Sequence, residues 1–228
     1  MAKIKFGAIG VEMRNKMGGS VFSKNRGGNY VRNKVSPVQP RTSYQQNQKA
    51  NLANNSSQWR GLTAAQMATW NTGTAAFPYT DVFGDVKTLS GQQLYVQLNN
   101  RLVAAGQARI TSCPSPVSVP QAKLTAAAAA AGAATFTVTV SDATVPTGCS
   151  LMIWATPELG LGITFVKPKM RQIGTTTLTA GVANIKTIWT NRFGSLVAGK
   201  NIWVRAVYIN NTTGQIGVPT QISCTVAA

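Results

Sequence analysis

The stretch NIWVRAVYINNTTGQIGVPTQISCTV, residues 201–226, decides the fold of the second half of the chain. Ile202, Val204 and Ala206 recur at every second position, which places their side chains on one face of a strand. Glycine-bearing turn residues follow, and a second strand-like run occupies 220–226. The stretch therefore predicts two antiparallel strands joined by a turn.

More strand-like runs surround this pair. ATFTVTV alternates in the same way, and CSLMIWATP, LGITFVKPK and TQISCTV are rich in residues that favour strands. The polyalanine run at 126–131 has a high helix propensity, but it is too short for an isolated helix and lies where a first strand is needed. Regularly spaced strands with Gly and Pro turns predict a β-sandwich over 122–228.

The segment 42–111 contains three patterns that indicate the start of a helix. Thr42–Gln45, Thr63–Gln66 and Ser90–Gln93 each place a hydroxyl residue three positions before a glutamine, which is the pattern of a capping box. They predict helices at 43–59, 64–72 and 91–105. Apolar residues recur along one face of these helices. They are Tyr44, Leu52, Trp59, Met67, Trp70, Leu94, Leu98, Leu102 and Ala105.

Trp59 and Trp70 could stack on a ligand, but we interpret them as core residues of a small three-helix unit spanning 42–111. The proline-rich SCPSPVSVPQ, residues 112–121, is expected to be a linker between this unit and the sandwich. The predicted fold class is therefore α+β and multidomain.

The first 41 residues differ in composition from the rest. Eleven of the 22 Lys and Arg residues of the chain fall in the first 60 positions. SVFSKN and NYVRNKV flank the turn-forming RGG, which predicts a hairpin, while Pro37 and Pro40 favour an extended connection after it. Lys24 and Arg26 are two apart, as are Arg32 and Lys34, so each pair is expected on one face of its strand. The ribbon has few apolar residues, so we expect a partner to order it.

Five cations of this arm are the candidate partner-binding residues. They are Lys24, Arg26, Arg32, Lys34 and Arg41. The glycines around them match no phosphate-loop spacing and lie between no strand and helix. An arm that docks on an acidic partner is the better interpretation.

The charge balance points to a negatively charged partner. The 22 basic residues face five acids, and the net charge is +17. Nucleic acid, an acidic protein lattice and a membrane surface are the partner classes that such a charge favours. No apolar run is long enough to span a membrane, and no apolar segment follows Met1–Phe6, so we expect a soluble protein made in the cytoplasm.

The sequence contains few of the residue types that enzymes use for catalysis. The chain has no histidine, and Asp81 and Asp85 are the only acids close together, in a loop where a turn explains them equally well. Cys113, Cys149 and Cys224 show neither a disulfide framework nor a zinc-binding CxxC pair. Cys149 and Cys224 are expected to pack as small apolar residues. We expect no catalytic residue, no metal, no cofactor and no enzymatic activity.

The paired runs at 201–226 resemble the last two strands of a fibronectin type III domain, which implies that the sandwich over 122–228 is immunoglobulin-like. The segment from Gly18 to about residue 120 resembles a recurrent module of uncharacterised tailed-phage and prophage proteins. The positions that carry this second resemblance are Gly28, Arg32, Pro40, Arg41, Thr42, Gln45, Trp59, Leu62, Thr63, Gln66, Trp70, Gly91, Leu94, Asn99 and Gly106.

The phage resemblance implies a virion structural protein, made in the host bacterium and found in the particle. Its partners would be capsid, portal or tail subunits, and it would be present in multiple copies on a symmetric assembly. Capsid attachment is slightly preferred over the tail or portal region. A protein that binds the packaged genome is an alternative, since Phe22 and Tyr30 lie among the cations of the arm.

Adhesion to host glycans is a further alternative. Exposed aromatic residues on loops would support it. Trp154, Trp189 and Trp203, however, all lie in strand-like runs, where we expect at least two of them to be buried.

Overall fold

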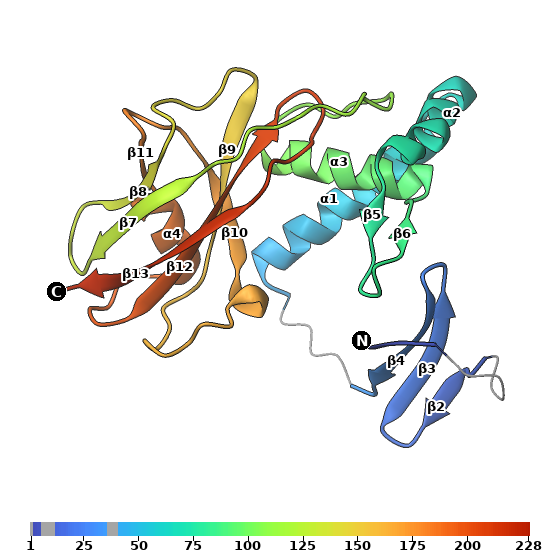
Figure 1. The fold of residues 1–228 in the computed structure, drawn as a ribbon, viewed down its shortest axis with the longest axis horizontal. Helices are drawn as coiled ribbons and strands as arrows, with labels where there is room; N and C mark the ends of the chain where they lie inside the picture. Colours follow the sequence, from blue (N-terminus) through green and yellow to red (C-terminus); the bar gives the residue numbers. More distant parts are fainter. Residues whose placement is uncertain (1, 6–11, 36–40) are drawn as a thin grey trace. The chain divides into compact units, whose positions relative to one another are not determined.

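The computed structural model describes residues 2–5, 12–35 and 41–228 (Figure 1). The chain forms two compact units, Met1–Gln46 and Asn47–Ala228. Both helices and strands are present, so the α+β class is confirmed. The predicted connection through Pro37 and Pro40 lies outside the described residues.

The first unit contains a four-stranded antiparallel sheet in the order β1-β4-β3-β2. Its strands are β1 (Ala2–Ile4), β2 (Asn15–Met17), β3 (Ser20–Asn25) and β4 (Gly28–Asn33). The predicted hairpin is confirmed as β3–β4, with Asn25 opposite Gly28. Gly28 has a φ of 105°, a conformation that favours glycine at the end of this tight turn.

The three predicted helices are confirmed. They are α1 (Ser43–Arg60), α2 (Ala64–Gly73) and α3 (Gly91–Ala104). Thr63 and Gln66 form a complete capping box at α2, and Ser90 and Gln93 form one at α3. At the start of α1 the backbone N–H of Gln45 donates to Thr42 Oγ1 over 3.3 Å. These side chains satisfy N–H groups that have no partner within the helix, which is why the helices begin there.

The two tryptophans of the helical segment are core residues, as predicted. Trp70 is fully buried and its Nε1 donates to the carbonyl of Thr111 over 2.8 Å. The ring of Tyr95 lies 5.2 Å from that of Trp70 and 5.4 Å from that of the partly buried Trp59. Leu94 and Leu98 complete the buried cluster. The prediction for Leu52 is wrong, because half of this side chain is exposed and α1 presents mostly polar residues.

A large curled mixed sheet forms the rest of the second unit. Its strand order is β10-β9-β12-β13-β7-β8-β11, with β13 and β7 parallel and every other neighbouring pair antiparallel. The strands are β7 (Leu124–Ala130), β8 (Phe136–Val140), β9 (Cys149–Ala155), β10 (Arg171–Thr176), β11 (Val182–Asn184), β12 (Asn201–Asn210) and β13 (Thr220–Ala227). The pair predicted from 201–226 is confirmed as β12–β13, and the polyalanine run lies in β7.

Two parts of this region differ from prediction. LGITFVKPK is not a strand; it forms a turn and loop that lead into a short 3-10 helix, η2 (Lys167–Lys169). Trp189 lies in a helix rather than a strand, α4 (Lys186–Phe193), which the sequence did not indicate. Trp189 is fully buried, whereas Trp154 and Trp203 are only half-buried, so the expectation of at least two buried tryptophans among these three is wrong.

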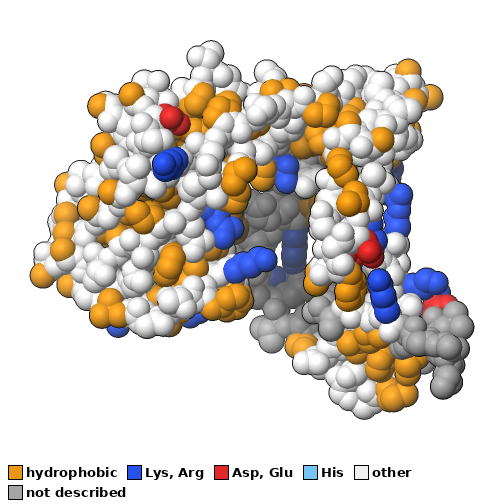
Figure 2. Space-filling model, in the orientation of Figure 1, with side chains coloured by type: hydrophobic (Ala, Val, Ile, Leu, Met, Phe, Trp, Pro, Cys, Tyr) orange, Lys and Arg blue, Asp and Glu red, His pale blue; other side chains and the backbone are white. Residues whose placement is uncertain are grey.

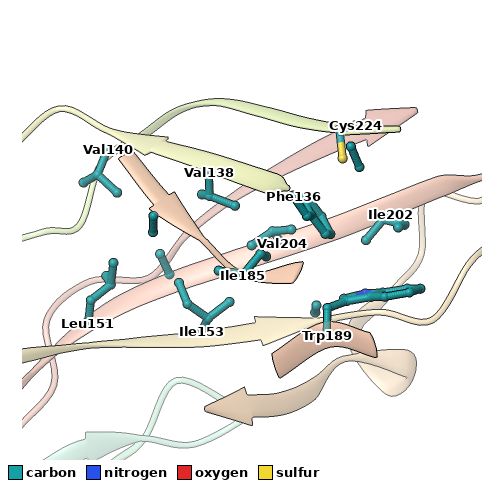
Figure 3. Packing of buried hydrophobic residues seen from close by; sticks show 14 of the residues in the cluster. Phe136, Val138, Val140, Leu151, Ile153, Ile185, Trp189, Ile202, Val204 and Cys224 are labelled. Carbon is teal, nitrogen blue, oxygen red and sulfur yellow. The ribbon is translucent and has the colours of Figure 1, made fainter. Parts of the chain in front are cut away.

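The main core lies within the curl of the large sheet. Figure 3 shows Phe136 and Val138 of β8 opposite Ile202 and Val204 of β12, with Trp189 of α4 closing one end. The inward side chains follow the predicted alternation on β8 and β12. Cys224 is buried in this core and Cys149 packs against it, which confirms their prediction as small apolar residues.

The outer face of the sheet packs against the helical segment. Ala105, just after α3, clusters with Met152 of β9 and Ile209 of β12. The proline-rich segment 112–121 contains no helix or strand, but the buried Gln215 holds it by two hydrogen bonds, to Ser115 and Val117. That this segment divides two domains stays a prediction.

Candidate partner-binding surface of the N-terminal sheet

The five predicted cations are all exposed but are not gathered in one cluster. Lys24 lies in β3, Arg26 in the β3–β4 turn and Arg32 in β4. Lys34 follows β4, where its backbone N–H donates to the carbonyl of Gly19 over 2.7 Å. Arg41 immediately precedes Thr42 and has a positive φ of 51°.

The strand register separates Lys24 from Arg32. Residues directly opposite each other on antiparallel strands project to the same face, and successive residues alternate between faces. Phe22 is opposite Val31, so Lys24 shares their face while Arg32 lies on the other. The prediction that Lys24 and Arg26 share one strand face is wrong, because Arg26 is in the turn.

One face of the sheet gathers cations from three strands. Arg32 is opposite Val21, Val21 is opposite Lys16, and the next row pairs Tyr30 with Lys3. We call this set (Lys3, Lys16, Val21, Tyr30 and Arg32) the basic face. Neighbouring strands lie about 5 Å apart, so Arg32 lies about one Debye length from each of the other two cations at physiological salt, while Lys3 and Lys16 are three strands apart. Their positive potentials therefore reinforce one another.

The opposite face is apolar in its centre. Ile4, Phe22 and Val31 lie on it, with Met17 at one edge, where 62% of its side chain is exposed. Leaving Ala2 aside, none of the described residues of this sheet is fully buried. A sheet without a buried core gains little hydrophobic stabilisation from folding alone. That a partner orders this sheet stays a prediction.

The acidic residues of the N-terminal half are committed to local partners. Glu12 accepts a hydrogen bond from Arg14 Nε over 2.5 Å, which lowers the pKa of Glu12. Asp81 Oδ1 accepts the backbone N–H groups of Phe83 and Asp85. These bonds stabilise the tight turn between β5 (Tyr79–Thr80) and β6 (Val86–Lys87), which follow the short 3-10 helix η1 (Thr74–Ala76). The turn interpretation of this acidic pair is thus confirmed.

The other acids also have partners within the chain. Lys87 pairs with Asp81 and lies 4.0 Å from Asp85, and its bond to Asp81 raises the pKa of Lys87. Asp142 accepts a hydrogen bond from the hydroxyl of Tyr208, and Glu158 accepts one from the backbone of Val197. Figure 2 shows few acidic side chains among the cations of the visible face. Five acids cannot neutralise 22 cations, so most of the positive charge is available to a partner.

Metal-binding groups and membrane-spanning helices are two further features that bear on function. Within 2–5, 12–35 and 41–228, no group of three His, Cys, Asp or Glu side chains could hold a metal ion. No helix among these residues is both long and apolar enough to cross a membrane. The cysteines are free thiols, and burial raises the pKa of Cys113 and of Cys149. The thiol form, which is the weaker nucleophile, is therefore favoured at neutral pH.

Most positions that carry the phage resemblance have structural roles. Trp59 and Trp70 belong to the core, and Thr63 and Gln66 cap α2. Pro40 lies outside the described residues, and Arg32 is the resemblance position that belongs to the basic face.

Sequence reasoning missed Lys3 and Lys16 as members of the basic face. The alternation of apolar and basic residues in AKIK indicated the first of them, but no short-range pattern indicated Lys16.

The chain matches no protein-family profile, no curated protein and no solved structure.

Proposed function

We propose that this chain is a non-enzymatic structural protein of a tailed-phage particle, attached to an acidic protein surface of the particle through the basic face of its N-terminal sheet. The observation that carries the proposal is the combination of cations from three strands on one face with the absence, Ala2 aside, of any fully buried residue among the described residues of that sheet. A sheet of this kind gains both charge neutralisation and order from an acidic partner.

An acidic protein fits this surface better than nucleic acid does. Val21 lies among the cations of the basic face, and Lys24 shares the opposite face with Phe22 and Val31. Both faces therefore place apolar side chains next to charged ones, as is typical of protein interfaces. Binding to duplex DNA draws mainly on phosphate contacts from Lys and Arg. Tyr30 among the cations favours nucleic acid as the second candidate, because aromatic side chains stack on unpaired bases.

The second unit is proposed to be the displayed part. Its β12–β13 pair and the curled sheet around a single core support an immunoglobulin-like domain, a scaffold that hosts many binding functions without determining any of them. We place the protein on the capsid, in multiple copies, with the tail or portal region and host adhesion as alternatives. On a symmetric particle each copy would present the same surface.

Particle incorporation tests the proposal. The variant Lys16→Glu/Arg32→Glu reverses two charges of the basic face, and Lys123→Glu/Lys200→Glu reverses two exposed charges of the second unit as a matched control. Mass spectrometry of purified particles should detect the wild-type chain and the control at equal levels, and the basic-face variant at least tenfold less. A wild-type chain that is absent from particles, or a basic-face variant that is incorporated normally, contradicts the proposal.

Binding to DNA separates the two candidates. Gel-shift titrations with duplex and single-stranded DNA at low salt would be run with the same variants. Affinity for DNA that disappears in Lys16→Glu/Arg32→Glu, together with normal incorporation of that variant, would assign the basic face to nucleic acid instead.

A further inference from the structure

A cleft of about 400 Å³ opens beside α3 in the second unit. Four segments line it: residues 77–79, which end at the first residue of β5, Leu89 before α3, the helix α3, and the turn between β12 and β13. The lining side chains used below are Phe77, Tyr79, Leu94, Gln97, Arg101 and Ile216. Its volume is at the lower end of the range of small-ligand sites. Tyr79 and Ile216 are 41% and 38% exposed, so the cleft is open at its rim.

Arg101 is the unusual residue of this cleft. Its side chain is only partly exposed, yet among the described residues it has no hydrogen bond or ion pair. It also lines a second hollow of about 190 Å³, beside Met152 and Trp154. The removal of water from the guanidinium lowers the pKa of Arg101. A desolvated charge without a counter-ion is costly, and its position in the last turn of α3 compensates only part of that cost through the helix dipole.

Gln97 adds a second donor one turn earlier on the same helix. Residues four positions apart on a helix share a face, and Gln97 and Arg101 both line the cleft. The side chain of Gln97 is exposed and makes no hydrogen bond to the described residues, and Phe77, Leu94 and Ile216 supply apolar surface beside it. Arginine binds a carboxylate through two parallel N–H bonds, which is the strongest polar contact this cleft can make.

We propose that this cleft binds a peptide segment of another protein in which a carboxylate side chain stands next to a large apolar side chain. Charge complementarity carries the choice of ligand, because the five acids of the chain are all engaged elsewhere and Arg101 is not. The apolar lining accounts for the neighbouring side chain. The site belongs to a different unit from the basic face, so its test does not depend on whether the function proposed above is correct.

Peptide binding to the full-length chain tests the proposal. A panel of fluorescent seven-residue peptides carries Asp or Glu flanked by Phe, Leu, Ile or Trp, and each peptide is matched by its Asn or Gln counterpart. In anisotropy titrations at physiological salt, acidic members should bind at least tenfold more tightly than their amide counterparts. Arg101→Gln should abolish that preference and Gln97→Ala should reduce it. Lys123→Gln, which removes one exposed charge elsewhere, should change affinity less than twofold. No binding by any member, or equal affinity for acid and amide peptides, overturns the proposal.

A stability measurement separates a binding role of Arg101 from a structural one. Since Arg101→Gln removes a desolvated charge that has no partner, its thermal midpoint should equal or exceed that of the wild type. A large fall in the midpoint of Arg101→Gln, together with unchanged peptide affinity in Gln97→Ala, would assign the guanidinium to folding and overturn the proposal.

Discussion

At the scale of single residues, Asn99 shows how the helical segment tolerates a buried amide. Asn99 is fully buried in α3, and its Nδ2 donates to the carbonyls of Tyr95 and Ile110 over 3.0 and 3.2 Å. Its Oδ1 accepts the backbone N–H of Ile110 over 2.8 Å. The amide thus fastens the chain after α3 to the helix without leaving a polar group unpaired.

Replacement of this amide should be costly. Asn99→Ala leaves the N–H and carbonyl of Ile110 without partners, and we expect a loss of about 2–3 kcal/mol in the free energy of unfolding. Urea denaturation measures the change. The exposed Asn54→Ala on α1 is the control and should change stability by less than about 0.5 kcal/mol. A cost for Asn99→Ala within that range would show that water or neighbouring groups replace the bonds.

Cys224 should make stability depend on pH in the alkaline range. Burial raises the pKa of Cys224 from an ordinary value of 9 to about 11. The folded state therefore retains this proton at pH values where the unfolded state loses it. The resulting stabilisation is complete below about pH 8.5 and is lost as the pH rises to about 11.

A comparison of variants isolates this effect. Between pH 8 and pH 11 the wild type should lose about 2–3 kcal/mol more unfolding free energy than Cys224→Ala, since the variant lacks the buried thiol at position 224. Urea denaturation at the two pH values measures the difference. Equal losses in the two proteins would contradict the prediction.

At the scale of elements, polar side chains anchor the long helix α1. Asn55 is its one fully buried residue. The Nδ2 of Asn55 donates to Asn100 Oδ1 over 2.6 Å, and its Oδ1 accepts a bond from Arg109 Nε over 2.5 Å. Trp59 is the main apolar contact of α1 with the core. A helix held in this way depends strongly on a few hydrogen bonds.

We therefore expect Asn55→Ala to loosen α1 specifically. The variant leaves two polar groups without a partner, and amide hydrogen exchange within 43–60 should accelerate about tenfold or more while exchange in β9 and β12 stays unchanged. Trypsin should cleave faster after Lys49. Asn54→Ala, one position away and exposed, is the matched control. Equal exchange rates in α1 of both variants would show that Trp59 alone holds the helix.

Elements with strong local signals were predictable from the sequence, and those that depend on tertiary contacts were not. The hydroxyl–glutamine pairs located α2 and α3 because the capping bonds form within four residues. The N-cap residue of α4 is Ile185, whose side chain cannot form a capping hydrogen bond. Thr187 and Ile188 within the helix also have low helix propensity. The buried Trp189 stabilises this helix through contacts that no local pattern reveals.

The prediction of a strand at 161–169 was wrong for the opposite reason, because the local pattern there was misleading. Its residues favour strands, but Gly160, Gly162 and Pro168 interrupt it, and Leu161 and Phe165 are left largely exposed. Two of the four strands behind the basic face could be predicted, because the RGG turn located β3 and β4. The other two, β1 and β2, have three residues each and were not predicted. The pairing of β1 with β4 also joins positions 25 to 29 residues apart. Short strands with distant partners carry too little local pattern to be recognised.

At the scale of the whole molecule, the buried core and the basic face lie in different units of the chain. The buried clusters that contain Trp70 and Trp189 lie in Asn47–Ala228. Ala2 aside, the first unit contains no fully buried residue among those described and carries the basic face. The stability of the chain should therefore come from one unit, while the other gains its order by binding. Under the proposed function, attachment through the first unit would leave the buried clusters of the second unit unchanged.

Separate fragments test this division. A fragment of residues 42–228 keeps all of α1 and both clusters, so its thermal midpoint should lie within about 2 °C of that of the full chain. A peptide of residues 1–41 has too few buried side chains for a stable sheet and should show a disordered circular-dichroism spectrum with no cooperative melting. If the purified acidic partner is added, strand signal should appear in the peptide, and Lys16→Glu/Arg32→Glu should prevent it. Cooperative melting of the free peptide, or a midpoint of fragment 42–228 well below that of the full chain, would show that the N-terminal sheet is a stabilising part of the fold rather than an arm ordered by its partner.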